Sequence, residues 1–519
     1  MSAETIKPPQ FSLERASDWL NPILVKETRQ SLKSRQFVAT FFLVLVASWI
    51  ISVFGIVFAG AGVEYRAVGG GFFSAYYVVL AIAVFVVVPF GAFRSLLGER
   101  DLHTWEVLSI TTLKPRQIVW GKLLSALVQV FIYYSAITPF MAFANLLKGI
   151  DVPTIGFVLI ASMIWSLTLS MTVLAASTFG SQRAWQVFLT LGVLGGLLLS
   201  LVFALQMVLG SVAFEIPFEE PGFWWAVGMI GSFVFAFCAL FLQIAISQLT
   251  FDADNRSSGI RLTAAGIFWL AVLWITIAFG LSGTFGLPPS LGTAVDGFLE
   301  VFSVVAGIYL FVIGLFAATE VDVLSRRVRR NVQRYGALRI LVAPLIPGGN
   351  RGLIYFLGHV AALAMFVFFM ATWRGSASVE VLYFAAAVVC YVTIYVMYGA
   401  AFGRMARSLS GDFRPAHARV LTVLAIALGS IMPQTLYFFD RLNAAQHPVY
   451  FVTDPFSTLY RMASNNPDSA FVLLILAIAA LAGICLNLRA MLVGLSDVTS
   501  PYVPPAPSAP RDIALELAS

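Results

Sequence analysis

Apolar residues occur along this chain in twelve runs that are separated by shorter polar stretches. About 20 apolar residues in an α-helix are enough to cross the hydrocarbon core of a bilayer. The runs cover residues 37–59, 72–93, 118–146, 153–178, 184–209, 223–249, 262–284, 298–318, 353–373, 379–403, 418–439 and 469–493. The pattern predicts an all-α, polytopic integral membrane protein with twelve transmembrane helices.

The positions of the basic residues agree with this number of spans and orient them. If the N-terminus is cytoplasmic, 27 of the 32 Lys and Arg residues fall in cytoplasmic segments and 5 in outer ones. Lys and Arg favour cytoplasmic loops. Adding or removing one span would disturb this alternation from that point on. Both chain ends are therefore predicted to be cytoplasmic.

Composition supports the same class. Of the 519 residues, 59% are hydrophobic and 11% are charged, whereas a soluble domain carries roughly 25% charged residues. The net charge of +6 indicates cytoplasmic faces on a lipid bilayer and no nucleic-acid partner. The three cysteines lie within apolar runs without metal-ligand spacing, so they are expected to be small buried side chains.

Two spans contain residues that change how a helix packs. Pro139 lies within the third run, where a proline can kink the helix. Gly192 and Gly196 form a GxxxG pair in the fifth run, which permits two helices to approach closely.

One polar segment, residues 94–117, differs from the other connections. Glu99, Arg100 and Asp101 are followed by a short helical pattern in which Leu102, Trp105 and Leu108 recur every third residue. Threonines end this pattern, and Pro115 can then occupy the first turn of the next helix. A short amphipathic helix between two spans is suited to contact with a soluble partner. The plain alternative is an ordinary charged cytoplasmic loop.

The order of residues in this segment resembles the coupling segment of ABC type-2 permeases. The residues that carry the resemblance are Glu99-Arg100-Asp101, Thr104-Trp105-Glu106-Val107-Leu108, Thr111-Thr112-Leu113-Lys114-Pro115-Arg116-Gln117-Ile118 and Gly121-Lys122. Two positions depart from the family pattern. Trp105 stands where leucine is common, and Lys114 stands where a serine would cap the next helix, although lysine is a poor N-cap.

The resemblance implies a function and a set of contact residues. It implies a permease subunit, most simply of an exporter in a bacterial cell (inner) membrane, to which a separate ABC ATP-binding subunit docks. Trp105 and Leu108 would make the apolar contact, and neighbouring charged residues the polar one. The residues implied in ATPase coupling are Glu99, Arg100, Asp101, Thr104, Trp105, Glu106, Leu108, Thr111 and Lys114.

The N-terminal segment, residues 1–36, is predicted to contain an interfacial helix. Asn21 can cap this helix and Pro22 can take its first position. Lys26, Arg29 and Lys33 follow at helical spacing, so that their cations can lie near lipid phosphates. The start of this helix also resembles the interfacial helix of ABC type-2 permeases. Alternatively, the segment is a basic flank that fixes topology.

The chain divides by pattern into a six-span core, residues 37–249, a second six-span half, residues 250–496, and a flexible Pro-rich tail, residues 497–519. The second half is either a diverged repeat or a set of added helices, in which case a second permease chain is needed. Its loop 319–352 corresponds in position to residues 94–117 but carries a basic run from Ser325 to Arg330. That run can fix topology, bind anionic lipid or meet a partner.

No nucleotide-binding or catalytic motif is visible. The Gly121-Lys122 pair is followed by Leu123 and so does not complete a GxxxxGK[ST] loop. ATP-Mg is therefore expected in the partner subunit, and this chain is expected to have no cofactor and no enzymatic activity of its own. The scarcity of mid-membrane carboxylates argues against a proton-driven carrier, but a secondary transporter and a membrane scaffold remain alternatives. The substrate is open.

Overall fold

The computed structural model is built of helices, and the residues that it describes include no β-strand. The described residues are 21–60, 65–101, 114–179, 183–213, 216–251, 254–280, 295–322, 324–374, 378–439, 451–463 and 468–500. Twelve helices within them are long and apolar enough to cross a membrane. The hydrophobic pattern therefore predicted the class correctly: the chain is an all-α polytopic integral membrane protein.

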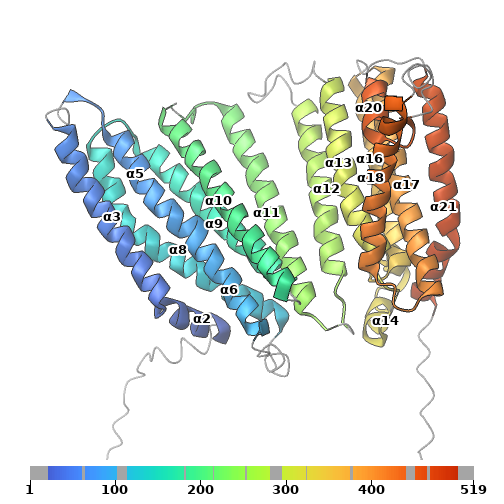
Figure 1. The fold of residues 1–519 in the computed structure, drawn as a ribbon, viewed down its shortest axis with the longest axis horizontal. Helices are drawn as coiled ribbons and strands as arrows, with labels where there is room; N and C mark the ends of the chain where they lie inside the picture. The colour runs from blue at the N-terminus through green and yellow to red at the C-terminus, as the bar shows by residue number, and fades with distance from the viewer. Residues whose placement is uncertain are drawn as a thin grey trace, which may run out of the picture. The chain divides into compact units, whose positions relative to one another are not determined.

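Internal contacts divide the chain into two compact units, Met1–Thr250 and Phe251–Ser519 (Figure 1). The first unit begins with a short helix, α2, and its spans are α3, the continuous segment α5–η1–α6, α8, α9, α10 and α11. Their bounds are α2 Pro22–Leu32, α3 Arg35–Ala59, α5 Gly69–Ala81, η1 Ile82–Val87, α6 Val88–Asp101, α8 Pro115–Leu146, α9 Val152–Ser177, α10 Arg183–Ala213 and α11 Pro221–Leu249.

The second unit has six spans, α12, α13, α16, α17, α18 and α21, together with short helices at their ends. The spans are α12 Ser258–Gly280, α13 Val295–Ala318, α16 Gly349–Arg374, α17 Val379–Leu409, α18 Pro415–Phe439 and α21 Ser469–Thr499. The short helices are α14 Arg326–Gln333, η3 Gly336–Leu338, α15 Arg339–Val342, η4 Ala343–Leu345 and α20 Pro455–Ala463.

The second span of the first unit changes its winding at mid-length. Six residues, Ile82–Val87, form a π-helical turn between α5 and α6. The hydroxyl of Ser166, on α9, donates a hydrogen bond of 2.6 Å to the carbonyl oxygen of Val84 in this turn. A side chain that supplies a hydrogen bond inside a helix is one of the recognised causes of such local rewinding. The wide turn is therefore held in place by the neighbouring span.

Buried tyrosines join the spans of the first unit. The Tyr133 hydroxyl on α8 hydrogen-bonds the Thr40 hydroxyl on α3 at 2.6 Å, and the Tyr76 hydroxyl on α5 hydrogen-bonds the Ser52 hydroxyl on α3 at 2.7 Å. Both tyrosine residues are fully buried. Because water is absent from the hydrocarbon core, each pair satisfies polar atoms that would otherwise be costly there.

The two span features noted in the sequence, Pro139 and the GxxxG pair, have different surroundings in the structure. Helix α8 continues through Pro139 from Pro115 to Leu146. At Gly192 and Gly196 a Cβ atom would meet no neighbouring helix within 4 Å among the described residues. The close approach that the GxxxG pair permits is therefore not made to any described helix of this chain.

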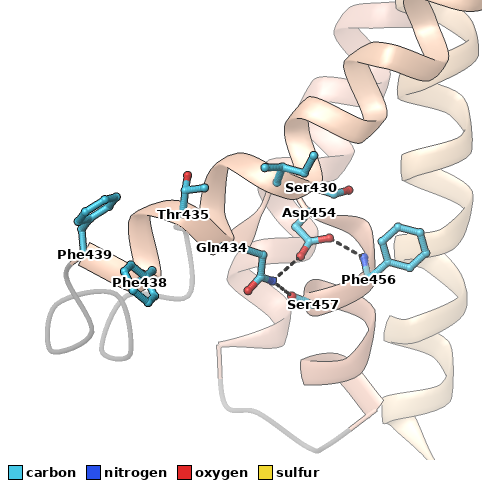
Figure 2. Close-up of a pocket in the computed structure, with 9 residues that line it drawn as sticks. Ser430, Gln434, Thr435, Phe438, Phe439, Asp454, Phe456 and Ser457 are labelled. Atoms are coloured by element: carbon cyan, nitrogen blue, oxygen red, sulfur yellow. Dashed lines mark hydrogen bonds between the residues drawn. The ribbon is translucent and has the colours of Figure 1, made fainter.

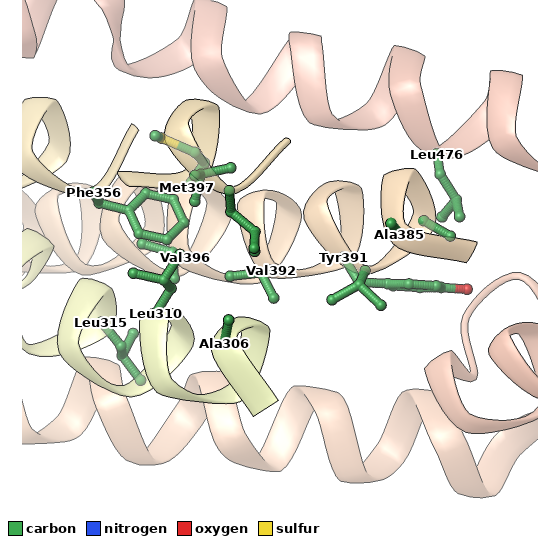
Figure 3. Packing of buried hydrophobic residues seen from close by; sticks show 14 of the residues in the cluster. Ala306, Leu310, Leu315, Phe356, Ala385, Tyr391, Val392, Val396, Met397 and Leu476 are labelled. Atoms are coloured by element: carbon green, nitrogen blue, oxygen red, sulfur yellow. The ribbon is translucent and has the colours of Figure 1, made fainter. Parts of the chain in front are cut away.

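Close packing occurs instead in the second unit, around its central span α17. Figure 3 shows Ala306 and Leu310 of α13 beside Val392 and Val396 of α17, all within one buried cluster. A Cβ atom at Gly307 would lie only 2.5 Å from Val388 Cγ1. The glycine thus permits α13 and α17 to approach closely, which is how small residues favour association of membrane helices.

The two units share a pattern of helix neighbours. In each unit the fourth span, α9 or α17, contacts the second, third, fifth and sixth spans, and the sixth span also contacts the third. The first span contacts the second and the third in both units: α3 contacts α5 and α8, and α12 contacts α13 and, through the Tyr355 hydroxyl that donates to the Arg261 carbonyl oxygen, α16. The central position of the fourth span is therefore common to both units.

Replacing Gly352 by alanine should destabilise the second unit, because a Cβ atom there would lie 2.0 Å from the carbonyl oxygen of Ala317 on α13. Overpacking of this kind costs about 1–3 kcal/mol, so the midpoint of thermal unfolding in detergent should fall. Gly358→Ala, on the same helix, is the matched control, since nothing lies within 4 Å of its Cβ position. Equal midpoints for the two variants would contradict the packing of α16 against α13.

Candidate coupling site

The predicted coupling segment leaves the first unit at the end of α6 and returns at the start of α8. Residues 102–113, between these two ends, lie outside the described residues. The predictions for Thr104, Trp105, Glu106, Leu108 and Thr111 therefore stay predictions. Arg100 and Asp101 are in the last turn of α6, and their side chains are likewise outside the description.

Helix α2 begins as its sequence predicts. The side chain of Asn21 accepts a hydrogen bond of 3.1 Å from the Ile23 amide, and Pro22 occupies the first helical turn. The same asparagine donates through Nδ2 to the carbonyl oxygen of Gln117, at 2.5 Å. Asn21 thus both caps α2 and attaches it to the first turn of α8.

Packing at this junction requires a glycine. Ile23 is buried, and a Cβ atom at Gly121 would lie 2.8 Å from Ile23 Cγ2. The glycine of the Gly121-Lys122 pair therefore lies where α2 and α8 pack closely together. Sequence reasoning had assigned no physical role to either residue of that pair.

Lys122 is the centre of a buried ionic cluster. Its Nζ atom lies 3.0 Å from Glu27 Oε1 on α2 and 3.1 Å from Glu99 Oε1 on α6. It also donates a hydrogen bond of 2.6 Å to Ser95 Oγ on α6, and Ser95 in turn donates to Glu27 Oε2 at 2.8 Å. We call these four residues the Lys122 cluster. The cluster joins three helices, α2, α6 and α8, on both sides of the coupling segment.

The charged side chains of this cluster are less exposed to solvent than that of Lys26 nearby. The side chains of Lys122, Glu27 and Glu99 are 2%, 12% and 15% exposed, whereas that of Lys26, 3.7 Å from Glu99, is 59% exposed. An exposed pair contributes little, since water competes with it. Removing one partner of a buried pair leaves an uncompensated charge and is strongly destabilising. The buried members therefore hold the three helix ends together.

The remaining predicted residues occupy the ends of helices. Lys114 lies at the N-cap position of α8 in an extended conformation, and its amide donates a hydrogen bond of 2.9 Å to Gln117 Oε1. Gln117 thus contributes a hydrogen bond where the lysine side chain, which has no acceptor, contributes none. On α2, Arg29 is exposed, and Lys33 lies just after the last helical residue, Leu32. Contact of these cations with lipid stays a prediction.

Glu27, Ser95 and Lys122 were not predicted as site residues. Lys122 lies seven residues after the start of a membrane helix. A lysine at such a position indicates an ion pair, because a buried ammonium group requires a carboxylate partner. The sequence offers several candidate partners, however. Glu27 and Lys122 are 95 positions apart, so that only the folded chain identifies the pair.

The corresponding loop of the second unit, 319–352, is folded against its spans. Arg261, on α12, is buried and donates to the carbonyl oxygens of Pro344, at 2.8 Å, and Ile346, at 2.6 Å. Its second terminal nitrogen lies 2.5 Å from Glu320 Oε2. Val328 and Val332 of α14 bury their side chains with Ala343, Ile346 and Val498. This loop is thus held by both an ionic contact and an apolar cluster.

A second polar feature in this unit lies where α18 meets α20. Figure 2 shows Gln434 pointing toward Asp454 and Ser457, beside a hollow of about 490 Å³. Gln434 Nε2 donates to Asp454 Oδ2 at 3.0 Å and to Ser457 Oγ at 2.8 Å, and Asp454 Oδ1 accepts from the Phe456 amide at 3.1 Å. These groups satisfy one another, so that the feature joins two helices.

Comparison with models of protein families, with characterised proteins and with solved structures finds no match to this chain. Among the described residues, no group of three or more His, Cys, Asp or Glu is arranged to hold a metal ion. The Lys122 cluster is therefore interpreted from its own geometry.

Lys122→Met should destabilise the first unit by about 3–5 kcal/mol, because two largely buried carboxylates lose their cation. Lys26→Met should cost less than about 1 kcal/mol, because that ion pair is exposed. Thermal unfolding of the purified chain in detergent would measure both effects.

Neutralising the two carboxylates tests whether their unpaired charges cause the destabilisation of Lys122→Met. In the triple variant K122M/E27Q/E99Q, the unpaired charges are absent, and part of the lost stability should return. A triple variant that is less stable than K122M alone would show that the destabilisation has another cause.

Proposed function

We propose that this chain is the membrane-spanning permease subunit of an ATP-driven exporter of the ABC type-2 class, energised by a separate ATP-binding subunit that docks on residues 94–117. The observation that carries the proposal is the Lys122 cluster. It joins α6, which leads into the coupling segment, to α8, which leads out of it, and to α2.

The geometry favours transmission of a displacement. A force applied to the segment between Asp101 and Pro115 acts on α6 and α8 at the same time, since both are continuous with it. The buried ion pairs and the Asn21–Gln117 hydrogen bond connect α2 to the same two helices. Movement of a bound ATPase would thus displace three helices together, two of which are membrane spans.

The two units support a further part of the proposal, in which the second unit is a diverged copy of the first. Both contain six spans, and in both the fourth span contacts the second, third, fifth and sixth. The loop that corresponds to the coupling segment is instead folded onto its unit through Arg261 and Glu320. Under this proposal one chain supplies both halves of a permease, and only the first half binds the ATPase.

Affinity purification from the native membrane in mild detergent tests the proposal. An ATP-binding subunit should co-purify, and the combined substitution Trp105→Ala and Glu106→Lys should abolish its association without changing the amount of folded permease. These two positions are preferred to Glu99, because Glu99 also binds Lys122 and its replacement would disturb the fold.

The matched control is the pair Arg326→Gln and Arg327→Gln in the loop of the second unit, where both side chains are exposed. This variant should retain the ATPase. Loss of the ATPase in the control alone would indicate that the ATPase docks on the second unit. A chain that purifies without any ATPase from several detergents would favour a secondary transporter or a scaffold.

A further inference from the structure

A polar cleft lies beside the Lys122 cluster, within the first unit. Helix α2, the start of α3, α6 and α8 line a space of about 740 Å³. Its wall is mixed: charged and amide side chains lie next to Phe37, Val87 and several alanines and glycines. Such a combination of polar and apolar lining suits a ligand that is itself amphiphilic.

The deeper part of the cleft contains polar groups that the fold leaves incompletely bonded. Gln129 is half-buried and lies about 21 Å along α8 from Pro115, at 1.5 Å per residue. Its Nε2 makes one long hydrogen bond of 3.4 Å, to the Ser125 carbonyl oxygen. Within the described residues, neither the Ser125 hydroxyl nor the side-chain amide oxygen of Gln129 has a hydrogen-bond partner. Polar groups at membrane depth are costly unless something satisfies them.

The rim of the cleft carries two exposed cations, one of which, Lys26, also lies 3.7 Å from Glu99. Lys26 and Arg94 are both exposed and line the opening. Counted together, the lining cations Lys26, Arg94 and Lys122 exceed the lining acids Glu27 and Glu99 by one charge. A single negative charge at the rim would balance the cleft, and a phosphodiester carries one.

We propose that this cleft binds a phospholipid of the inner leaflet. The phosphodiester lies at the rim near Arg94 and Lys26, at the depth of the headgroups. The ester carbonyl oxygens of the glycerol, which lie deeper in a leaflet than the phosphate, accept hydrogen bonds from Gln129 Nε2 and Ser125 Oγ. The acyl chains leave along α3, where Phe42 is 67% exposed.

The proposal is independent of ATPase coupling, because it concerns binding alone. The test is photolabelling of the full chain, reconstituted in bilayers that contain a phospholipid with a diazirine near its glycerol, followed by mass spectrometry of the labelled peptides. Label should concentrate on the peptides of α3, α6 and α8 that line the cleft. Gln129→Leu should reduce this labelling about fivefold, the factor expected for the loss of one hydrogen bond.

Gln206→Leu is the matched control, since Gln206 is an exposed glutamine on α10, outside the cleft. It should leave the labelling unchanged, and Arg94→Gln should reduce it. Equal labelling in the wild type and in Gln129→Leu would overturn the proposal. Complete competition by inorganic phosphate would also overturn it, because the ligand would then be a free anion and not a lipid.

Discussion

The first unit depends on the neutralisation of one buried ammonium group. Lys122 lies inside a membrane-embedded unit, where an unpaired charge is expensive, and its two carboxylate partners come from different helices. Glu27 is on α2 and Glu99 is on α6. None of the three elements can move away alone without exposing a charge to an apolar environment. The local arrangement of α2, α6 and α8 is therefore constrained by this electrostatic requirement, in addition to the packing of Ile23 against Gly121 and the Asn21–Gln117 hydrogen bond.

The second unit meets a similar requirement by different means. Arg261 is also buried, but most of its hydrogen bonds go to backbone carbonyl oxygens of one loop, and Glu320 supplies the carboxylate. A guanidinium group has five donors in a fixed plane, so that one side chain can organise several turns of backbone. The lysine of the first unit joins three helices, whereas the arginine of the second fixes the path of a loop.

The sequence predicted the features that depend on local composition. Twelve apolar runs predicted the twelve span-length helices of the described residues. The Asn21-Pro22 pair predicted the start of α2, and Pro115 predicted the start of α8. It could not predict which acid meets Lys122, because pairing across 95 positions depends on how helices pack. For the same reason it could not show which glycines lie at close helix contacts: the described residues leave open space at Gly192 and Gly196, whereas Gly307 and Gly352 are closely packed. The docking residues between 102 and 113 stay predictions.

The π-helical turn in the second span affects which side of its last part, α6, faces α8. Each residue of an α-helix turns the chain by about 100°, and a π-helical turn accommodates one residue more than an α-helical turn. Ser95 and Glu99 lie beyond this turn, on α6. A second span wound as a regular α-helix would present a different side of α6 to α8, and Lys122 would lose both partners there. The π-helical turn, whose Val84 carbonyl oxygen accepts the hydrogen bond from Ser166, thus contributes to orienting Ser95 and Glu99 toward Lys122.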